Sequence, residues 1–277
     1  MSTPRVFPDR LRPGPASPEE AAAATAYTAP ALEKGLDILE LLAADADGLS
    51  QGAIAQRLGR STNEIFRMLA VLERRGYVIR HAADASYRLT LRLFALAHQH
   101  PPLKRLLTVA LPAMQELATT TRQSNHLVIH FARRILVVAQ VDSPEPMGFA
   151  VRLGAHFPFR PDRASSRVLS AFQPGAVQDE LIAEMAANSP RTTSRTKVRA
   201  ELAEIGERGF YMAPSETTAG VTDLCAPIFD HSDGAVAALT LPYLKQRDVS
   251  VGVASARKEL LATTARISVG LGGQPRR

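Results

Sequence analysis

The sequence is poor in cysteine and in long apolar runs. Cys225 is the one cysteine among 277 residues, which excludes a disulfide within the chain and suits a reducing cytoplasm. No apolar run approaches the ~20 residues that a membrane-spanning helix needs, and the N-terminus lacks the basic-then-apolar pattern of a secretion signal. We also find no P-loop and no triad-like arrangement on which catalysis could rest. These absences predict a cytoplasmic protein with no membrane partner, which is not an enzyme and carries no cofactor and no metal.

Positive charge is what the sequence has in excess. Its formal net charge is +6 and its pI is near 9.8, which fits a nucleic-acid partner and equally fits a merely soluble basic protein. A chain of 277 residues can build two hydrophobic cores. Residues 1–28 are rich in proline and alanine and cannot bury enough apolar surface to order themselves, so a disordered tail is predicted there.

The stretch 49–78 predicts two helices joined by a tight turn. Gln51–Leu58 forms the first helix, and Gly59 leaves room only for a turn. Ser61 and Glu64 then stand three residues apart, the spacing of a capping box at a helix start. The second helix has an apolar stripe and an opposite face with basic and amide side chains. This pattern is typical of a helix-turn-helix, although an ordinary helical hairpin would share it.

Residues after the second helix favour DNA binding. Gly76 ends the helix, and Tyr77–Arg80 and Tyr87–Leu89 form two short strands around a polar turn, the wing of a winged helix. Between Gln51 and His100, eight arginines stand against three acidic residues. This excess suits phosphate contact, so we predict that the domain binds double-stranded DNA.

The outer face of the second helix supplies the candidates for DNA contact. Arginine can pair with guanine and asparagine with adenine through two hydrogen bonds, so Arg67 and Asn63 are candidates for base contact. A salt bridge or a phosphate contact remains the alternative for Arg67. Thr62 and the arginines at the helix start and wing favour phosphate contact. The predicted DNA contacts are Arg60, Ser61, Thr62, Asn63, Arg67, Arg80 and Arg88.

Two further helices complete the N-terminal half. Ala31–Ala43 is amphipathic and is expected to be the first helix of the winged domain, which covers residues 29–90. A linker helix is predicted over residues 91–102, where Pro101 and Pro102 stop it.

The chain changes character at residue 103. Helices and β-rich runs from there to residue 277 indicate an α+β domain with a mostly antiparallel sheet. We expect a helix over Leu103–Thr121 that Pro112 kinks or breaks. Further strands are expected at 148–153 and 155–159, and a polar loop is expected at 189–197.

Five blocks of the sequence, in this order, resemble one known family. They are ALEKGLDILELLA, GLSQGAIAQRLGRSTNEIFRMLAVLERRGYV, YRLTLRLFALA, GAHFPF with ASSRVLSAF, and RGFYMAPSETTAGVTDLCAPIFDHSDGAVAALTL. From about Ala31 to Leu271 the chain is therefore similar to the IclR family of bacterial transcription regulators. The resemblance implies a winged-helix domain, a linker helix, and a GAF-like domain that binds a small-molecule effector. It also implies homodimers, which often pair into tetramers.

The resemblance further implies which residues line the effector cavity. Strand alternation places Val221, Asp223 and Cys225 on one face of their strand, and Thr240 and Pro242 on one face of theirs. The predicted effector-binding residues are Met147, Ala164, Ser165, Ala213, Val221, Asp223, Cys225, Thr240 and Pro242. For Val221 and Cys225 a purely structural place in the core is the alternative.

Departures from the family pattern predict the chemistry of the effector. Arg160 follows Phe159 where the family often has a histidine, and Ser166-Arg167 stands where many members have Gly-Lys. We expect Arg160, Arg163 and Arg167 to cluster around a helix start and to favour an anion, with Phe157 and Phe159 as apolar wall. Asp223 and Thr240 could accept hydrogen bonds from hydroxyl groups. Together these residues predict an organic or hydroxylated aromatic acid.

Two alternatives remain at this point. The chain could be a small-molecule-binding protein or an enzyme whose N-terminal helices serve dimerisation only. His126 and His130 share one face of a predicted strand and could hold a metal, but without a third ligand nearby in the sequence a packed or surface pair is favoured.

Overall fold

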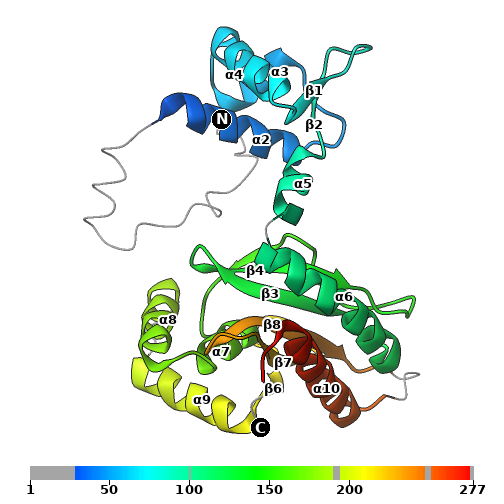
Figure 1. Ribbon diagram of the computed structural model, residues 1–277, viewed down its shortest axis with the longest axis vertical. Coiled ribbons are helices and arrows are strands. Elements are labelled where there is room, and N and C mark those ends of the chain that lie inside the picture. The colour runs from blue at the N-terminus through cyan, green and yellow to red at the C-terminus, as the bar shows by residue number, and fades with distance from the viewer. Residues whose placement is uncertain (1–28, 100, 190–193, 247–250, 275–277) are drawn as a thin grey trace. The chain divides into compact units, whose positions relative to one another are not determined.

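The computed structural model describes residues 29–99, 101–189, 194–246 and 251–274 (Figure 1). The predicted disordered tail, residues 1–28, lies outside these described residues. The chain divides into two compact units, Met1–Lys104 and Arg105–Arg277, and each is described by itself.

The first unit is a small helical domain with a two-stranded wing. Its elements are α2 (Pro30–Ala43), α3 (Gln51–Leu58), α4 (Thr62–Arg74), β1 (Val78–Arg80), β2 (Tyr87–Leu89) and α5 (Arg92–Gln99). Ile38, Ile54, Ile65 and Leu69, all fully buried, bring α2, α3 and α4 together in one core. The predicted helix-turn-helix is confirmed, with the capping box of Ser61 and Glu64 at the start of α4.

Glycine decides the geometry at two turns of this unit. Gly59 adopts a left-handed conformation (φ 62°) that ends α3 and leads directly into α4. Gly48 (φ +79°) lies against the wing, where a Cβ atom would come within 2.8 Å of the Tyr87 carbonyl oxygen. Leu49 therefore approaches β2 closely enough to exchange backbone hydrogen bonds of 2.8 and 3.1 Å with Tyr87. The wing is thus held against the start of α3.

The second unit is built on a six-stranded antiparallel sheet in the order β5-β4-β3-β8-β7-β6. The strands are β3 (Asn125–Phe131), β4 (Arg134–Val141), β5 (His156–Pro158), β6 (Tyr211–Pro214), β7 (Val221–Phe229) and β8 (Ala235–Leu244). The helices are α6 (Pro101–Thr121), α7 (Ala164–Ala171), α8 (Gly175–Asn188), α9 (Arg195–Arg208) and α10 (Val253–Leu271).

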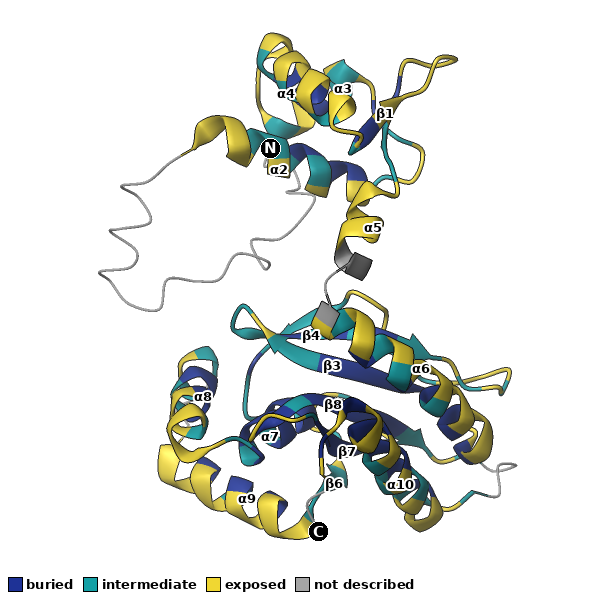
Figure 2. Ribbon diagram, in the orientation of Figure 1, coloured by how far each residue is buried: buried dark blue, intermediate teal, exposed yellow. Residues whose placement is uncertain are grey.

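Helices cover both faces of this sheet and create two cores. Leu224, Leu239 and Leu241 face α6 and α10, while Cys225 and Ala238 face α7, α8 and α9. Figure 2 shows the buried central strands and the exposed outer faces of the helices. The alternation predicted for β7 and β8 is therefore present, and the α+β class with an antiparallel sheet is confirmed.

The structure corrects four local predictions, some of them only in their bounds. Residues 148–153 form no strand. This segment is a loop, and its Phe149 carbonyl accepts a hydrogen bond from the Ser124 hydroxyl. The strand predicted at 155–159 is confirmed with shorter bounds, as His156–Pro158 pairs with β4. Pro112 lies inside α6, which is one helix of 21 residues rather than two. In the predicted polar loop, α9 already begins at Arg195, where Ser194 Oγ accepts from the Lys197 N–H at 3.4 Å.

Candidate DNA-binding surface and effector cavity

The N-terminus of α4 is fixed by three polar side chains. The Ser61 N–H donates to Glu64 Oε2 at 3.2 Å, and the Glu64 N–H donates to Ser61 Oγ at 3.4 Å. Lys34 of α2 adds an ion pair to Glu64 at 2.5 Å. The hydrogen bonds from Lys34 and Ser61 lower the pKa of Glu64 to about 2, so its carboxylate is charged at neutral pH. This arrangement orients α4 relative to α2.

The predicted DNA-contact residues lie on the outside of this unit. Thr62, Asn63 and Arg67 are exposed on α4, and Arg60 and Arg80 are exposed at the turn and the wing. Ser61 is also exposed, but its hydroxyl donates to Glu64 at 2.9 Å as part of the capping box. Arg88 is half-buried and lies 3.4 Å from Asp84. The DNA-contact role of all seven residues stays a prediction.

One serine motif invites a catalytic interpretation that the structure does not support. Gly48–Gly52 reads GLSQG and so matches the letters of the nucleophile motif GxSxG. Ser50, however, is the N-cap of α3, and its Oγ accepts from the Ala53 N–H at 3.2 Å. A nucleophilic serine would instead stand on a strained turn between a strand and a helix.

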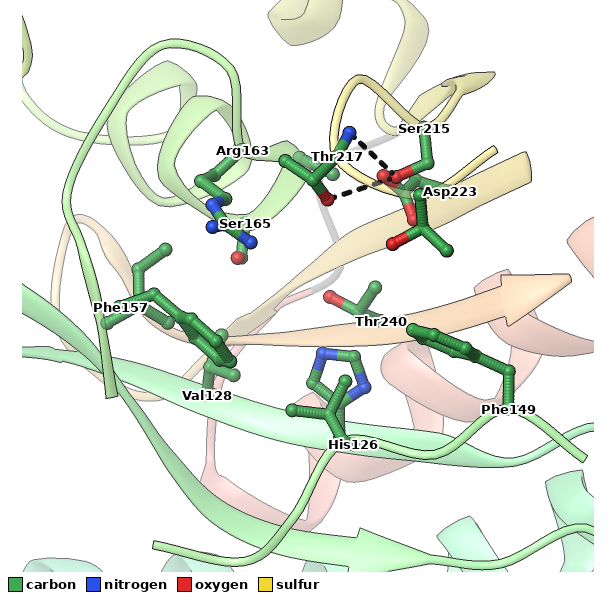
Figure 3. A pocket seen from close by; sticks show the side chains of 14 residues that line it. His126, Val128, Phe149, Phe157, Arg163, Ser165, Ser215, Thr217, Asp223 and Thr240 are labelled. Carbon is green, nitrogen blue, oxygen red and sulfur yellow. Dashed lines mark hydrogen bonds between the residues drawn. The ribbon is translucent and has the colours of Figure 1, made fainter. Parts of the chain in front are cut away.

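A cavity of about 240 Å³ lies in the second unit between the sheet and the start of α7 (Figure 3). Strands β3, β4, β5, β7 and β8 supply its floor and walls, and the segment between β6 and β7 closes one side. The lining residues are His126, Val128, Ile135, Phe149, Val151, Phe157, Arg163, Ala164, Ser165, Ser215, Thr217, Thr218, Asp223 and Thr240.

Two opposite charges reach this cavity from different elements. Arg163 precedes α7, and its guanidinium lies 4.9 Å from the centre of the Phe157 ring. Asp223 comes from β7. Burial lowers the pKa of Arg163 and raises that of Asp223, while a hydrogen bond from Ser215 and the charge of Arg163 partly oppose the rise at Asp223. A ligand that forms hydrogen bonds with both Arg163 and Asp223 would compensate for the hydration that these groups lose on burial.

His126 and Thr240 form the polar part of the floor. They are direct partners in neighbouring strands β3 and β8, and both side chains point into the cavity in Figure 3. Burial lowers the pKa of His126 to about 4, so its imidazole is neutral at pH 7. Thr240 Oγ1 lies 3.2 Å from Cys225 Sγ, beneath the cavity surface. Because burial raises the pKa of Cys225 to about 12, this thiol does not have the reactivity of a redox sensor.

The predicted effector residues divide into two groups. Ala164, Ser165, Asp223 and Thr240 line the cavity. Cys225 and Val221 are buried on β7, and Met147 is 77% exposed. The residues outside the lining are Met147, Ala213, Val221, Cys225 and Pro242.

Only one of the three predicted arginines reaches the cavity. Arg163 lines it, whereas Arg160 pairs with Asp162 through two hydrogen bonds of 2.7 and 3.1 Å. Arg167 turns to the other side of α7, where it bonds Tyr211 at 2.6 Å. Phe157 forms part of the cavity wall, as predicted. Phe159 does not line the cavity, because it is fully buried in the core.

Sequence reasoning did not assign His126 to the cavity. The even spacing of His126 and His130 was the only signal, and it favoured a packed or surface pair over a metal site. His130 instead lies 3.0 Å from Glu184 of α8 and packs against Phe159. The described part of the chain contains no group of three or more His, Cys, Asp or Glu side chains that could hold a metal. In the same described ranges, no helix is long and apolar enough to cross a membrane.

A winged helix-turn-helix unit and a separate α+β unit with a polar-lined cavity define a class, the ligand-responsive DNA-binding regulators. Residues 31–81 match the IclR helix-turn-helix domain, and residues 103–269 match the bacterial transcriptional regulator IclR C-terminal domain. The chain belongs to the IclR family. It is a transcription regulator with a DNA-binding domain and a C-terminal effector domain, and it is not an enzyme.

Individual relatives are distant in sequence. The chain is 28% identical over 209 residues to the glycerol operon regulatory protein of Streptomyces griseus, covering 75% of this chain and 82% of that protein. It is 25% identical over 244 residues to the HTH-type transcriptional regulator XynR of Escherichia coli, covering 87% and 96%. An IclR homolog from Microbacterium hydrocarbonoxydans, solved in complex with 4-hydroxybenzoate, has a TM-score of 0.71 at 22% identity and covers 87% and 98%. Thermotoga maritima IclR has a TM-score of 0.70 at 22% identity, with the same coverage.

Proposed function

We propose that a small organic acid with at least one hydroxyl group binds this cavity and controls operator binding. The observation that carries the proposal is that Arg163, the residue before α7, and Asp223 of β7 both line one cavity. A guanidinium binds a carboxylate through parallel hydrogen bonds. The free N–H groups at the start of α7, at Ala164 and Ser165, add to this preference for an anion.

The other side of the cavity suits a hydroxyl group. Asp223 accepts hydrogen bonds when ionised, and the neutral imidazole of His126 and the hydroxyl of Thr240 can each accept one more. Phe157, Phe149 and Val128 provide apolar contacts in the same cavity. A purely apolar ligand would desolvate the Asp223 carboxylate further and offer it no hydrogen bond beyond the one from Ser215. An aromatic hydroxy acid fits these requirements, and the structurally similar Microbacterium protein was solved with such a compound.

The rest of the proposed function concerns the partners. We propose that the protein acts in the cytoplasm as a homodimer or tetramer, with residues 29–90 as the DNA-binding domain, 91–102 as linker and 103–277 as effector domain. Two copies of α4 would enter successive major grooves, so half-sites would lie one or more helical turns of ~34 Å apart. The DNA contacts proposed for α4 are Thr62, Asn63 and Arg67, with phosphate contacts at Arg60, Arg80 and Arg88.

A thermal-shift screen of hydroxy acids against their methyl esters tests the effector. Acids should raise the melting temperature and esters should not, because an ester cannot form the charged pair with Arg163. Arg163→Gln should abolish the acid-specific shift, and Asp223→Asn should reduce the preference for hydroxylated over plain acids. Arg160→Gln is the matched control, since Arg160 is paired with Asp162 and lies outside the lining. Equal stabilisation by acids and esters would contradict the proposal.

A further inference from the structure

An exposed aromatic side chain lies on the recognition helix. Phe66 keeps 55% of its surface exposed, although its neighbour Ile65 is fully buried in the core. Helical periodicity places Phe66 between Asn63, three residues before it, and Ala70, four residues after it. Both of these residues are exposed, as is Arg67. Phe66 therefore lies on the exposed side of α4 and does not belong to the core in which α2, α3 and α4 pack together.

The charge around Phe66 indicates which kind of molecule covers it. Arg60, Arg67 and Arg74 are exposed at the start, middle and end of the same helix region. The one acidic residue in the first turn, Glu64, is held by Lys34 and Ser61. An apolar ring among arginines, with a neutral amide three residues away, complements a surface that carries phosphates beside apolar groups. The major groove of DNA is such a surface, because each thymine presents a C5 methyl group there.

We propose that Phe66 packs on the C5 methyl group of a thymine and so selects thymine at one position of each operator half-site. The inference rests on the DNA-binding function of the family and adds a base-reading residue that forms no hydrogen bond. Asn63 and Arg67 can read hydrogen-bonding edges, and Phe66, to one side of both on the helix, would read a methyl group beside them. Phe66 discriminates thymine from cytosine at that position by the presence of the methyl group.

Removal of single methyl groups from the DNA tests this contact. An operator is first selected from a random duplex library with the full-length protein. Each thymine is then replaced in turn by deoxyuridine, which pairs identically and lacks only the methyl group. At one position in each half-site, the replacement should weaken binding about three- to fivefold, because this is the contribution expected of one buried methyl group. With Phe66→Ala, operator binding should weaken and the difference between thymine and deoxyuridine at that position should vanish.

Two variants control for folding and for general apolar character. Val71→Ala changes another exposed apolar residue of α4, which is 40% exposed and five residues further along, on a different side of the helix. It should leave the deoxyuridine effect unchanged. Phe66→Leu keeps an apolar contact and should retain part of the preference for thymine. Melting temperatures close to that of the parent protein are expected for all three variants, since both positions are exposed.

Three results would overturn the inference, and they are distinguishable. A selected operator whose thymines all tolerate loss of the methyl group would remove the contact while leaving DNA binding intact. Dissociation of the oligomer by Phe66→Ala, with equal loss of affinity on every sequence, would show that a second copy of the chain covers this ring. Failure of the full-length protein to select any DNA sequence would overturn the DNA-binding function together with the inference.

Discussion

At the scale of single residues, the cavity carries nearly balanced charge. Arg163 brings a positive charge, Asp223 a negative one, and His126 is neutral at pH 7 because burial lowers its pKa to about 4. A ligand with only a carboxylate would pair with Arg163 and offer no hydrogen bond to Asp223. A ligand that also donates a hydrogen bond to Asp223 stabilises that carboxylate. The balance favours a ligand with two polar ends.

His126 should make stability depend on pH. A histidine whose folded pKa is depressed contributes stability above its unfolded pKa of about 6.5, and this stability is lost as pH falls towards about 4. The full effect is on the order of 3 kcal/mol. Denaturant unfolding at pH 7, 5.5 and 4.5 should show a smaller loss for His126→Gln than for the parent protein.

Asp223 must be separated from this effect. Its raised pKa acts in the opposite direction, with stability present at low pH and lost as pH rises. The difference between parent and variant at each pH therefore isolates His126. Parallel profiles for His126→Gln and the parent would contradict the burial of a neutral imidazole.

Arg67 should matter for sequence preference rather than for stability. Its side chain is exposed on α4. Arg67→Ala should weaken binding to the selected operator by ~1–3 kcal/mol and change the melting temperature little. Equal loss on operator and on random duplex DNA would make Arg67 a phosphate contact. No loss on either would place α4 outside the groove.

At the scale of elements, one half-buried arginine connects the segment beside the cavity to two other elements. Arg167 of α7 lies 2.8 Å from Glu216 and 3.5 Å from Glu201 of α9, and its guanidinium stacks 5.2 Å from the centre of the Tyr211 ring. Glu216 is flanked by Ser215 and Thr217, which both line the cavity. The network thus ties the segment between β6 and β7 to the helix whose first residues also line the cavity.

Breaking this network should loosen the segment selectively. Glu216→Gln removes the charge that Arg167 meets at 2.8 Å. Hydrogen exchange should rise in residues 215–220 and stay unchanged in β3 and β8, and the effector-induced thermal shift should decrease. Asp179→Asn is the matched control, because the Asp179–Arg199 pair joins α8 to α9 on the exposed surface. Unchanged exchange at 215–220 would show that the segment is held by its own turn.

Elements with a local cause could be predicted from the sequence. The capping box at Ser61, the left-handed turn at Gly59 and the alternation of β7 follow from residue types at fixed spacing. Side-chain direction depended on neighbours that are distant in sequence. Arg167 turns away from the cavity because Glu216 and Tyr211 meet it on the other side of α7, and no local pattern encodes that meeting.

Dependence on neighbours that are distant in sequence also explains the wrong predictions at residues 148–153 and at Pro112. Residues 148–153 have the composition of a strand, but they form a loop, and only the following His156–Pro158 pairs with β4. Pro112 is tolerated inside α6, where Met114 and Ala110 on the same helix are fully buried against the sheet. Tertiary packing outweighed local propensity at both positions.

At the scale of the whole molecule, the two units have separate cores. Ile38, Ile54 and Leu69 belong to the first, and none of them contributes to the two cores of the second. The division falls between Lys104 and Arg105, inside α6. Most of this helix belongs to the second unit, where its Leu106, Ala110 and Met114 pack in the core. A fragment that keeps α6 whole therefore needs to begin at Pro101.

Fragment 101–277 should fold alone and keep the effector response. It contains all of the cavity lining and both cores of the sheet. A hydroxy acid at about 100 times its Kd would stabilise it by ~2.7 kcal/mol, which corresponds to roughly 5–10 °C in melting temperature for a domain of this size. The parent protein should show a shift of the same size in its effector domain. Fragment 29–99 should show no shift with the same acid, but should bind random duplex DNA with affinity that falls steeply with salt. A fragment 101–277 that folds but no longer responds would mean that the effector site needs residues from the first unit or from a second copy.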